Sequence, residues 1–126
     1  MSTETQSTTV PTFVASIYVG TIHGYARPFK PTPVTPLERI ESACREYCDR
    51  VGLCVTVTPT TFVYKGRSEP GAAIGLINYP RFPSALDAFR KRALDLAGML
   101  KELCGQIRVS VVMTTGGETT MIGPME

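Results

Sequence analysis

The chain has 126 residues, of which 43% are hydrophobic and 19% are charged, and its formal net charge is +2. A chain of this length forms one domain that is large enough to bury a core. The nearly balanced charge predicts neither a nucleic-acid-binding stripe nor a strongly acidic surface. With a single histidine, the chain lacks most of the usual catalytic constellations.

The domain organisation is simple. Residues 1–11 are polar and predict an N-terminal arm outside the core, and residues 12–126 predict a single α+β domain. No apolar run reaches the roughly 20 residues of a membrane-spanning helix. The first residues also lack the basic and apolar regions of a signal peptide. We therefore expect a cytoplasmic protein without a membrane partner.

The first half of the domain predicts a strand followed by a helix. Both faces of Thr12–Gly20 are largely apolar, which favours a central strand. A proline-rich loop then leads to a helix, for which Thr35 is the expected N-cap and Pro36 the first helical residue. Glu38 would complete a capping box with Thr35, and Gly52 would end the helix.

The second half predicts three further strands and a second helix. Leu53–Tyr64 alternates like a strand, and Pro59 places that strand at a sheet edge because proline cannot donate to a ladder. Gly66–Gly71 predicts a turn, and Ala72–Tyr79 a buried strand. The remaining predicted elements are a helix capped by Ser84 with Asp87 and closed by Gly105, a strand over Ile107–Met113, a turn at Gly116–Gly117, and a strand over Glu118–Ile122.

This order of elements predicts a fold class. A β-α-β-β-α-β order is typical of the ferredoxin-like sandwich, in which two helices cover one face of a sheet; here an extra C-terminal hairpin strand is added. The first and third strands are the most apolar and are predicted to be central, with the second strand at an edge. We also expect the first and third strands to run parallel, so that the loops after them meet at one edge.

The loops after the first and third strands would form a ligand site where they meet at that edge. The N-termini of both helices favour anions there, which suits a phosphate or a nucleotide-like ligand. In an alternative, structural interpretation, Asn78 and Ser84 cap the chain reversal, Phe82 fills the core under the second helix and Arg81 is solvated. The candidate ligand-binding residues are His23, Tyr25, Arg27, Asn78, Arg81, Phe82 and Ser84.

The four cysteines do not have a standard metal-binding spacing. Cys44 and Cys48 share a face of the first predicted helix, so a structural zinc site with Cys54 or His23 is one interpretation. Free cysteine behaves as a small core hydrophobe in a reducing compartment. We therefore predict reduced core thiols, no metal and no cofactor.

Candidate catalytic residues are few. A Cys–His or Ser–His pair would have to use His23, and no nucleophile lies in a recognisable elbow. Glu69 and Tyr64, near the second hairpin, are candidates for acid–base chemistry, although a turn role for Glu69 is the simpler interpretation. We therefore predict that the chain is not an enzyme.

The helix-free face of the predicted sheet is apolar whichever residues it presents, and such a face normally has a partner. This predicts a homo-oligomer. An RNA-binding sheet would need basic residues, but the strands carry almost none besides Arg108. We expect a protein partner or a small anionic ligand, and no nucleic acid.

Several segments resemble a group of small proteins found in phage and prophage sequences. They are IYVG from Ile17, CREYCDRVGLCVTVTPTTFVY, EPGAAIGLINYPRFP and the IRVSVVM strand. The similarity covers about Ile17 to Met113, and Gly75–Pro83 is its most distinctive part. The resemblance implies a viral accessory or virion protein, in the host cytoplasm or the virion, and assigns no functional residue.

Three functions are weighed. The main hypothesis is a non-catalytic, oligomer-forming phage-type protein, structural or host-interacting, which acts on itself or on another viral or host protein through its arm and sheet face. The first alternative is a binder that sequesters an anionic, nucleotide-like molecule at the loops after the first and third strands. The second alternative is a small enzyme of unknown reaction.

Overall fold

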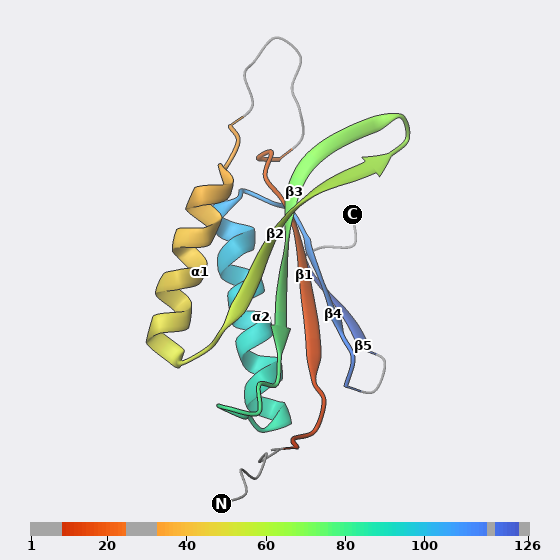
Figure 1. Cartoon of the computed structure of the whole chain (residues 1–126). Coiled ribbons are helices and arrows are strands. Elements are labelled where there is room, and N and C mark those ends of the chain that lie inside the picture. Colours follow the sequence, from red (N-terminus) through yellow and green to blue (C-terminus); the bar gives the residue numbers. More distant parts are fainter. Residues whose placement is uncertain (1–8, 25–32, 116–117, 124–126) are drawn as a thin grey trace, which may run out of the picture.

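The computed structural model describes residues 9–24, 33–115 and 118–123. Five strands form one sheet, and two helices cover one of its faces (Figure 1). The predicted α+β class is confirmed. Within the described residues, no helix is long and apolar enough to cross a membrane. The elements are β1 (Val14–Gly20), α1 (Leu37–Val51), β2 (Val55–Tyr64), β3 (Arg67–Ile77), α2 (Leu86–Leu103), β4 (Val109–Met113) and β5 (Glu118–Ile122).

The strands lie in the order β2-β3-β1-β4-β5, and every neighbouring pair is antiparallel. The predicted edge position of β2 agrees with this order, and Pro59 lies in that edge strand. The predicted parallel pairing of the first and third strands is wrong, because Val14 pairs with Ile77 and Gly20 with Gly71. The physical reason is connectivity: the α1 crossover leaves β1 and β2 in the same direction, and β3 returns between them through a hairpin.

The β2–β3 hairpin is longer than the sequence predicts. The two strands stay paired as far as Tyr64 and Arg67, so Gly66–Gly71 is not a turn. The reversal uses Lys65 and Gly66 alone, whose φ angles of 49° and 74° are those of a type I′ turn. The hairpin therefore projects beyond the rest of the sheet and curves away from the helices (Figure 1).

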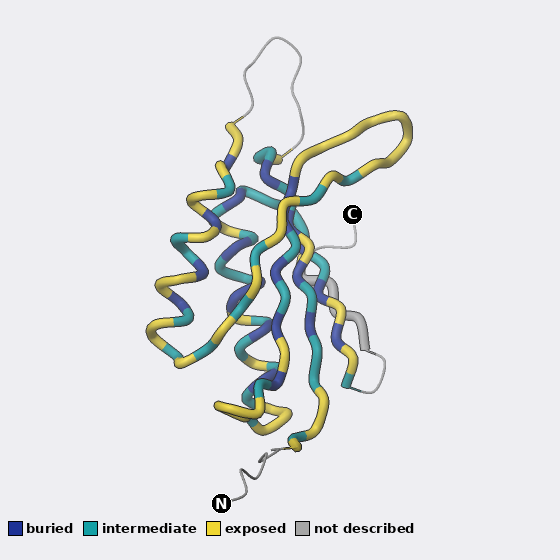
Figure 2. Tube along the Cα trace, viewed as in Figure 1, coloured by how far each residue is buried: buried dark blue, intermediate teal, exposed yellow. Residues whose placement is uncertain are grey.

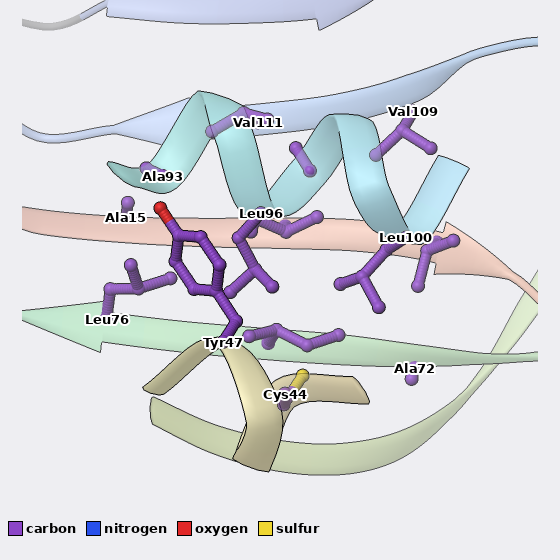
Figure 3. Packing of buried hydrophobic residues seen from close by; sticks show 14 of the residues in the cluster. Ala15, Cys44, Tyr47, Ala72, Leu76, Ala93, Leu96, Leu100, Val109 and Val111 are labelled. Atoms are coloured by element: carbon purple, nitrogen blue, oxygen red, sulfur yellow. The ribbon is translucent and has the colours of Figure 1, made fainter. Parts of the chain in front are cut away.

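The core lies between the sheet and the helices. α2 contacts β1 and β4, and α1 contacts α2 and β2. Alternate residues of the central strands are buried against the helices, whereas the outer surfaces of the helices and the projecting hairpin are exposed (Figure 2). Figure 3 shows how the helix side chains meet the sheet in this core, which includes Ala15, Ala72, Leu76, Val109 and Val111 from the strands and Cys44, Tyr47, Ala93, Leu96 and Leu100 from the helices.

Neither predicted capping box forms. The N-caps of α1 and α2 are Pro36 and Ala85, and neither helix has a side-chain capping bond. The expected caps have tertiary partners instead, since the Thr35 hydroxyl bonds to His23 and the Ser84 hydroxyl accepts a bond from Arg92. Interactions with distant parts of the chain have thus replaced the local ones.

The four cysteines are free. Cys44 and Cys104 are buried, as predicted for core thiols, but Cys54 is exposed. Burial raises the pKa of Cys44 from 9.0 to about 12, so this thiol is protonated at neutral pH. No group of three or more His, Cys, Asp or Glu residues that could hold a metal ion occurs in the described part of the chain.

Candidate functional site

The predicted ligand-binding residues do not form one site. His23 follows β1, whereas Asn78 follows β3 and donates its backbone N–H to the carbonyl of Phe13, just before β1, at 3.0 Å. Because β1 and β3 are antiparallel, their carboxyl ends lie at opposite ends of the sheet. The expected meeting of the two loops is therefore wrong. Tyr25 and Arg27 lie outside the described residues.

At the Asn78 end, the structural interpretation accounts for two of the candidates. The buried Asn78 amide donates from Nδ2 to the carbonyl of Pro11 at 2.8 Å. Its Oδ1 accepts the backbone N–H of Ser84 at 2.8 Å. These two bonds join the chain before β1 to the loop before α2, so both oxygen and nitrogen of this amide are engaged within the protein.

The other two candidates at this end are on the surface. Arg81 is exposed, and Phe82 is 43% exposed, with its ring centroid 5.3 Å from that of Tyr79. The idea that Phe82 fills the core is wrong, because Phe89 of α2 occupies that position and is 1% exposed. Ligand binding by Arg81 and Phe82 stays a prediction.

At the opposite end of the sheet, His23 connects the chain after β1 to Thr35, just before α1. The Thr35 hydroxyl donates to the carbonyl of Leu103 at 3.3 Å and lies 2.6 Å from Nε2 of His23. These two contacts hold His23 and Thr35 together beside the end of α2. A Cβ at Gly105 would lie 2.5 Å from Nδ1 of His23, so this packing requires glycine there. Ligand binding by His23 also stays a prediction.

A cavity of about 370 Å³ opens where the β2–β3 hairpin meets the sheet. We call it the hairpin pocket. It contains one carboxylate, two guanidinium groups and two aromatic rings, a mixture that suits a polar ligand with an aromatic part. Its lining residues are Gly24, Phe62, Tyr64, Arg67, Glu69, Gln106, Ile107 and Arg108.

One wall of the hairpin pocket follows from strand register. Phe62 pairs with Glu69 and Tyr64 with Arg67, and residues directly opposite in an antiparallel ladder point to the same face. Because side chains alternate along a strand, these four residues share one face of the hairpin. Val57 of β2 packs against the core, so residues of β2 with even numbers, including Phe62 and Tyr64, point to the helix-free face of the sheet. The four side chains therefore reach the pocket together.

Two glycines make room for this wall. Gly20 and Gly71 are partners on neighbouring strands. A Cβ at Gly71 would lie 2.1 Å from the ring of Phe62, and one at Gly20 would lie 2.8 Å from Oε1 of Gln106. The Phe62 ring thus packs directly on the backbone of Gly71, and the Gln106 amide packs directly on the backbone of Gly20.

The opposite wall comes from the segment that leads into β4. Gln106 is fixed by two bonds from its Nε2, to the carbonyls of Ile22 at 2.7 Å and of Cys104 at 2.9 Å. Arg108 lies two residues before Ser110, which pairs with Tyr18. By strand alternation Arg108 is on the same helix-free face as Tyr18, and its side chain is half-buried.

Two other cavities have less suitable linings. A cavity of about 420 Å³ between α1 and β2 is lined by three thiols, aliphatic side chains, Glu41 and Arg45. A cavity of about 340 Å³ at the Asn78 end is lined mainly by the chain before β1 and has no charged residue. The hairpin pocket is not the largest of the three, but it gathers a carboxylate, guanidinium groups and aromatic rings in one place.

Of the three comparisons with known proteins, the one with solved structures found matches. No family model matches the chain, and no curated protein matches it. Two solved structures do. A phage SAM lyase in the apo state has a TM-score of 0.69 and 21% identity over 90% of both chains. A phage SAM lyase in complex with S-methyl-5'-thioadenosine has a TM-score of 0.71 and 17% identity over 97% of both chains. The chain shares its fold with a phage SAM lyase.

This finding corrects the main functional hypothesis. A non-catalytic structural or assembly protein was predicted, and the chain was predicted not to be an enzyme. Both predictions are contradicted, because the solved structures that share almost the whole fold are those of an enzyme. The sequence contains none of the familiar catalytic constellations, and such motifs do not determine the fold.

Sequence reasoning found part of the hairpin pocket. Glu69 and Tyr64 were named as candidates for acid–base chemistry, and both line it. Phe62 and Arg67 are not among the predicted candidates, because a turn over Gly66–Gly71 excludes the ladder that pairs them with Glu69 and Tyr64. The Lys65–Gly66 dipeptide between two alternating segments was the signal that would have extended the hairpin.

Proposed function

We propose that the chain is an enzyme of the SAM lyase type, which cleaves S-adenosylmethionine and releases S-methyl-5'-thioadenosine. The observation that carries the proposal is the hairpin pocket, which Glu69 lines together with aromatic and guanidinium side chains. The likeness of the fold to that of a SAM lyase supports the same reaction.

The proposed reaction breaks the bond between the sulfonium sulfur and Cγ of the methionine part. The bonding electrons go to sulfur, which becomes the neutral thioether of S-methyl-5'-thioadenosine. A lyase adds no water, so the four-carbon fragment either closes on its own carboxylate or loses a proton to form a double bond. Detection of the lactone or of the unsaturated amino acid distinguishes these two routes.

The side chains of the hairpin pocket suit both parts of this substrate. Phe62 and Tyr64 offer ring faces on which adenine can stack. The carboxylate of Glu69 attracts the positive sulfonium or ammonium group, and a pocket that is closed on one side by the sheet strengthens this attraction relative to bulk water. We assign binding and orientation of the cationic part to Glu69.

The test is a turnover assay on the purified full chain with S-adenosylmethionine, in which S-methyl-5'-thioadenosine is measured by mass spectrometry. We expect product from the wild type. We expect Glu69→Gln to lower kcat/KM by about tenfold to a hundredfold, since hydrogen bonds to charged groups contribute about 1.5–3 kcal/mol.

Glu41→Gln is the matched control, because Glu41 lies on α1 and lines the cavity on the other side of the sheet. This variant is expected to keep full activity. The proposal is wrong if the wild type forms no S-methyl-5'-thioadenosine, and the assignment to Glu69 is wrong if both variants lose activity equally.

We further propose that the chain associates with itself through the open face, the helix-free face of the sheet. Tyr18, Ile77 and Val112 on this face are 41%, 42% and 38% exposed, and small residues such as Ser16, Ala73 and Gly75 lie between them. An apolar face of this kind favours a partner, and a second copy would cover it.

We also propose a ferredoxin-like sheet that β5 extends beyond β4, and the strand order supports this. The likeness to a phage enzyme supports the proposed relation to phage-type proteins that share the segment Gly75–Pro83. We propose that the protein is located in the cytoplasm of the infected cell.

A further inference from the structure

We propose that Arg108 binds the carboxylate of the amino-acid part of the substrate, so that the hairpin pocket selects an adenosyl sulfonium amino acid over ligands that lack the carboxylate. This inference rests on the proposed function and assigns one residue to one end of the substrate. It starts from the distribution of charge in the pocket.

The charges of the hairpin pocket are on different walls. Glu69 comes from the hairpin, and Arg108 comes from the segment entering β4 on the far side of β1. Gly20, which carries no side chain, lies on the strand between them, β1, and its partner Gly71 lies on the strand of Glu69, β3. S-adenosylmethionine likewise carries its sulfonium and its carboxylate at separate positions, so the two walls can bind opposite charges of one molecule.

Arg108 is better placed than Arg67 for this role. Arg67 is exposed and is paired with Tyr64 at the hairpin end, where Tyr64 itself is 72% exposed. Arg108 is half-buried and lines the pocket on the wall opposite Glu69. A guanidinium group that is partly removed from water interacts more strongly with a carboxylate than an exposed one does.

The backbone of Arg108 is also held in place. Gly123 packs so closely that a Cβ there would lie 2.7 Å from Cα of Arg108 and 2.4 Å from the carbonyl oxygen of Ile107. The backbone of Gly123 has a φ angle of 129°, a conformation that side chains rarely adopt. The segment that contains Arg108 therefore packs between β1, which contains Tyr18, and Gly123, which follows β5.

The first test needs no variant. Binding to the wild-type full chain is measured by calorimetry for S-adenosylhomocysteine, which has the carboxylate, and for S-methyl-5'-thioadenosine, which does not. The Kd of S-adenosylhomocysteine is also compared with that of its decarboxylated form, because these ligands are not cleaved and their Kd values report binding alone. We expect decarboxylation to raise the Kd by about tenfold or more. Equal Kd values for the two compounds would overturn the inference.

The second test uses variants. Arg108→Gln is expected to raise the Kd of S-adenosylhomocysteine by about tenfold or more and to leave the Kd of S-methyl-5'-thioadenosine within about twofold. Arg108→Lys keeps the charge but not the guanidinium group, so an intermediate effect is expected. Arg45→Gln is the matched control, because Arg45 lies on α1 and lines the cavity on the other side of the sheet; it should change neither Kd by more than about twofold.

The outcomes separate this inference from the proposed function. If the wild type neither binds nor cleaves any of these compounds, the proposed function fails. If the wild type cleaves S-adenosylmethionine but Arg108→Gln weakens both ligands equally, or neither, the proposed function stands and the role of Arg108 is wrong. The Kd of S-methyl-5'-thioadenosine also reports whether the pocket of each variant is intact.

Discussion

At the scale of single residues, the hairpin pocket depends on two positions where the chain has no side chain. Gly71 lies under the ring of Phe62, and its partner Gly20 lies under the amide of Gln106. Gly71 falls within the turn predicted over Gly66–Gly71, whereas the structure places it in β3. Whether a glycine ends a strand or makes space above it depends on a distant aromatic residue, which local patterns do not contain.

Gly71→Ala tests this arrangement. The added Cβ would meet the Phe62 ring at 2.1 Å and the carbonyl oxygen of Val19 at 2.7 Å, and the backbone oxygen cannot move aside. We expect a loss of about 1–3 kcal/mol in the free energy of unfolding, measured by urea denaturation, and a displaced Phe62 with weaker ligand binding.

Gly98→Ala is the matched control for that experiment. Gly98 lies inside α2, and a Cβ there would meet nothing within 4 Å. Alanine is the better helix former, so this variant should be more stable than the wild type by about 0.5–1 kcal/mol. If Gly71→Ala were as stable as Gly98→Ala, the close packing of Phe62 on β3 would be wrong.

At the scale of elements, the sequence predicts most helices and strands but not how they are related. The apolar alternation of β1 and the helical periodicity before Gly52 are local, and they predicted these elements correctly. The relative direction of β1 and β3 is set by the crossover and the hairpin. Because the two strands were predicted to be parallel, the loops after them were predicted to form one site. The Thr35 and Ser84 caps failed because each side chain has a tertiary partner.

Cys44 of α1 and Cys54, the residue before β2, give a prediction at this scale. Cys44 faces the core and its pKa is raised to about 12, mainly by burial, whereas Cys54 is exposed. The thiolate is the reactive form, so at pH 8 a pKa of 12 instead of 9 lowers its fraction by about a thousandfold. We expect iodoacetamide to modify Cys54 well before Cys44, as followed by peptide mass spectrometry. Equal rates in the folded protein would contradict the packing of α1.

The same shift in pKa predicts how stability depends on pH. The unfolded chain loses the Cys44 proton near pH 9, while the folded chain keeps it until about pH 12. The folded state therefore binds more protons between these values, and the free energy of unfolding should fall as the pH rises from about 9 to 12. Urea titrations at several pH values measure this, and Cys44→Ala should have a smaller fall. A wild-type stability that rises over this range would contradict the assignment.

At the scale of the whole molecule, the sheet has one face under the helices and one that the described residues leave uncovered. The hairpin pocket opens at the end of this open face. The apolar composition of both strand faces predicted an uncovered apolar face, but which residues occupy it follows from the register, with Tyr18, Ile77 and Val112 on it. Composition alone did not reveal that such a face also borders a cavity lined by a carboxylate, guanidinium groups and aromatic rings.

Self-association through the open face is tested by a charge at its centre. Val112 pairs with Ser16 in the middle of the sheet, so Val112→Glu would place a carboxylate in the proposed interface. We expect the wild type to be oligomeric and this variant to be monomeric at micromolar concentration, as measured by light scattering. Glu46→Lys on the outer side of α1 is the control. A monomeric wild type would rule out the proposal.

The most direct test of the account is a crystal structure of the full chain grown with S-methyl-5'-thioadenosine. The account predicts the nucleoside in the hairpin pocket, with adenine against Phe62 or Tyr64 and its sulfur on the side of Glu69. A nucleoside bound in the cavity between α1 and β2 or at the Asn78 end, or a pocket left empty at saturating ligand, would contradict it.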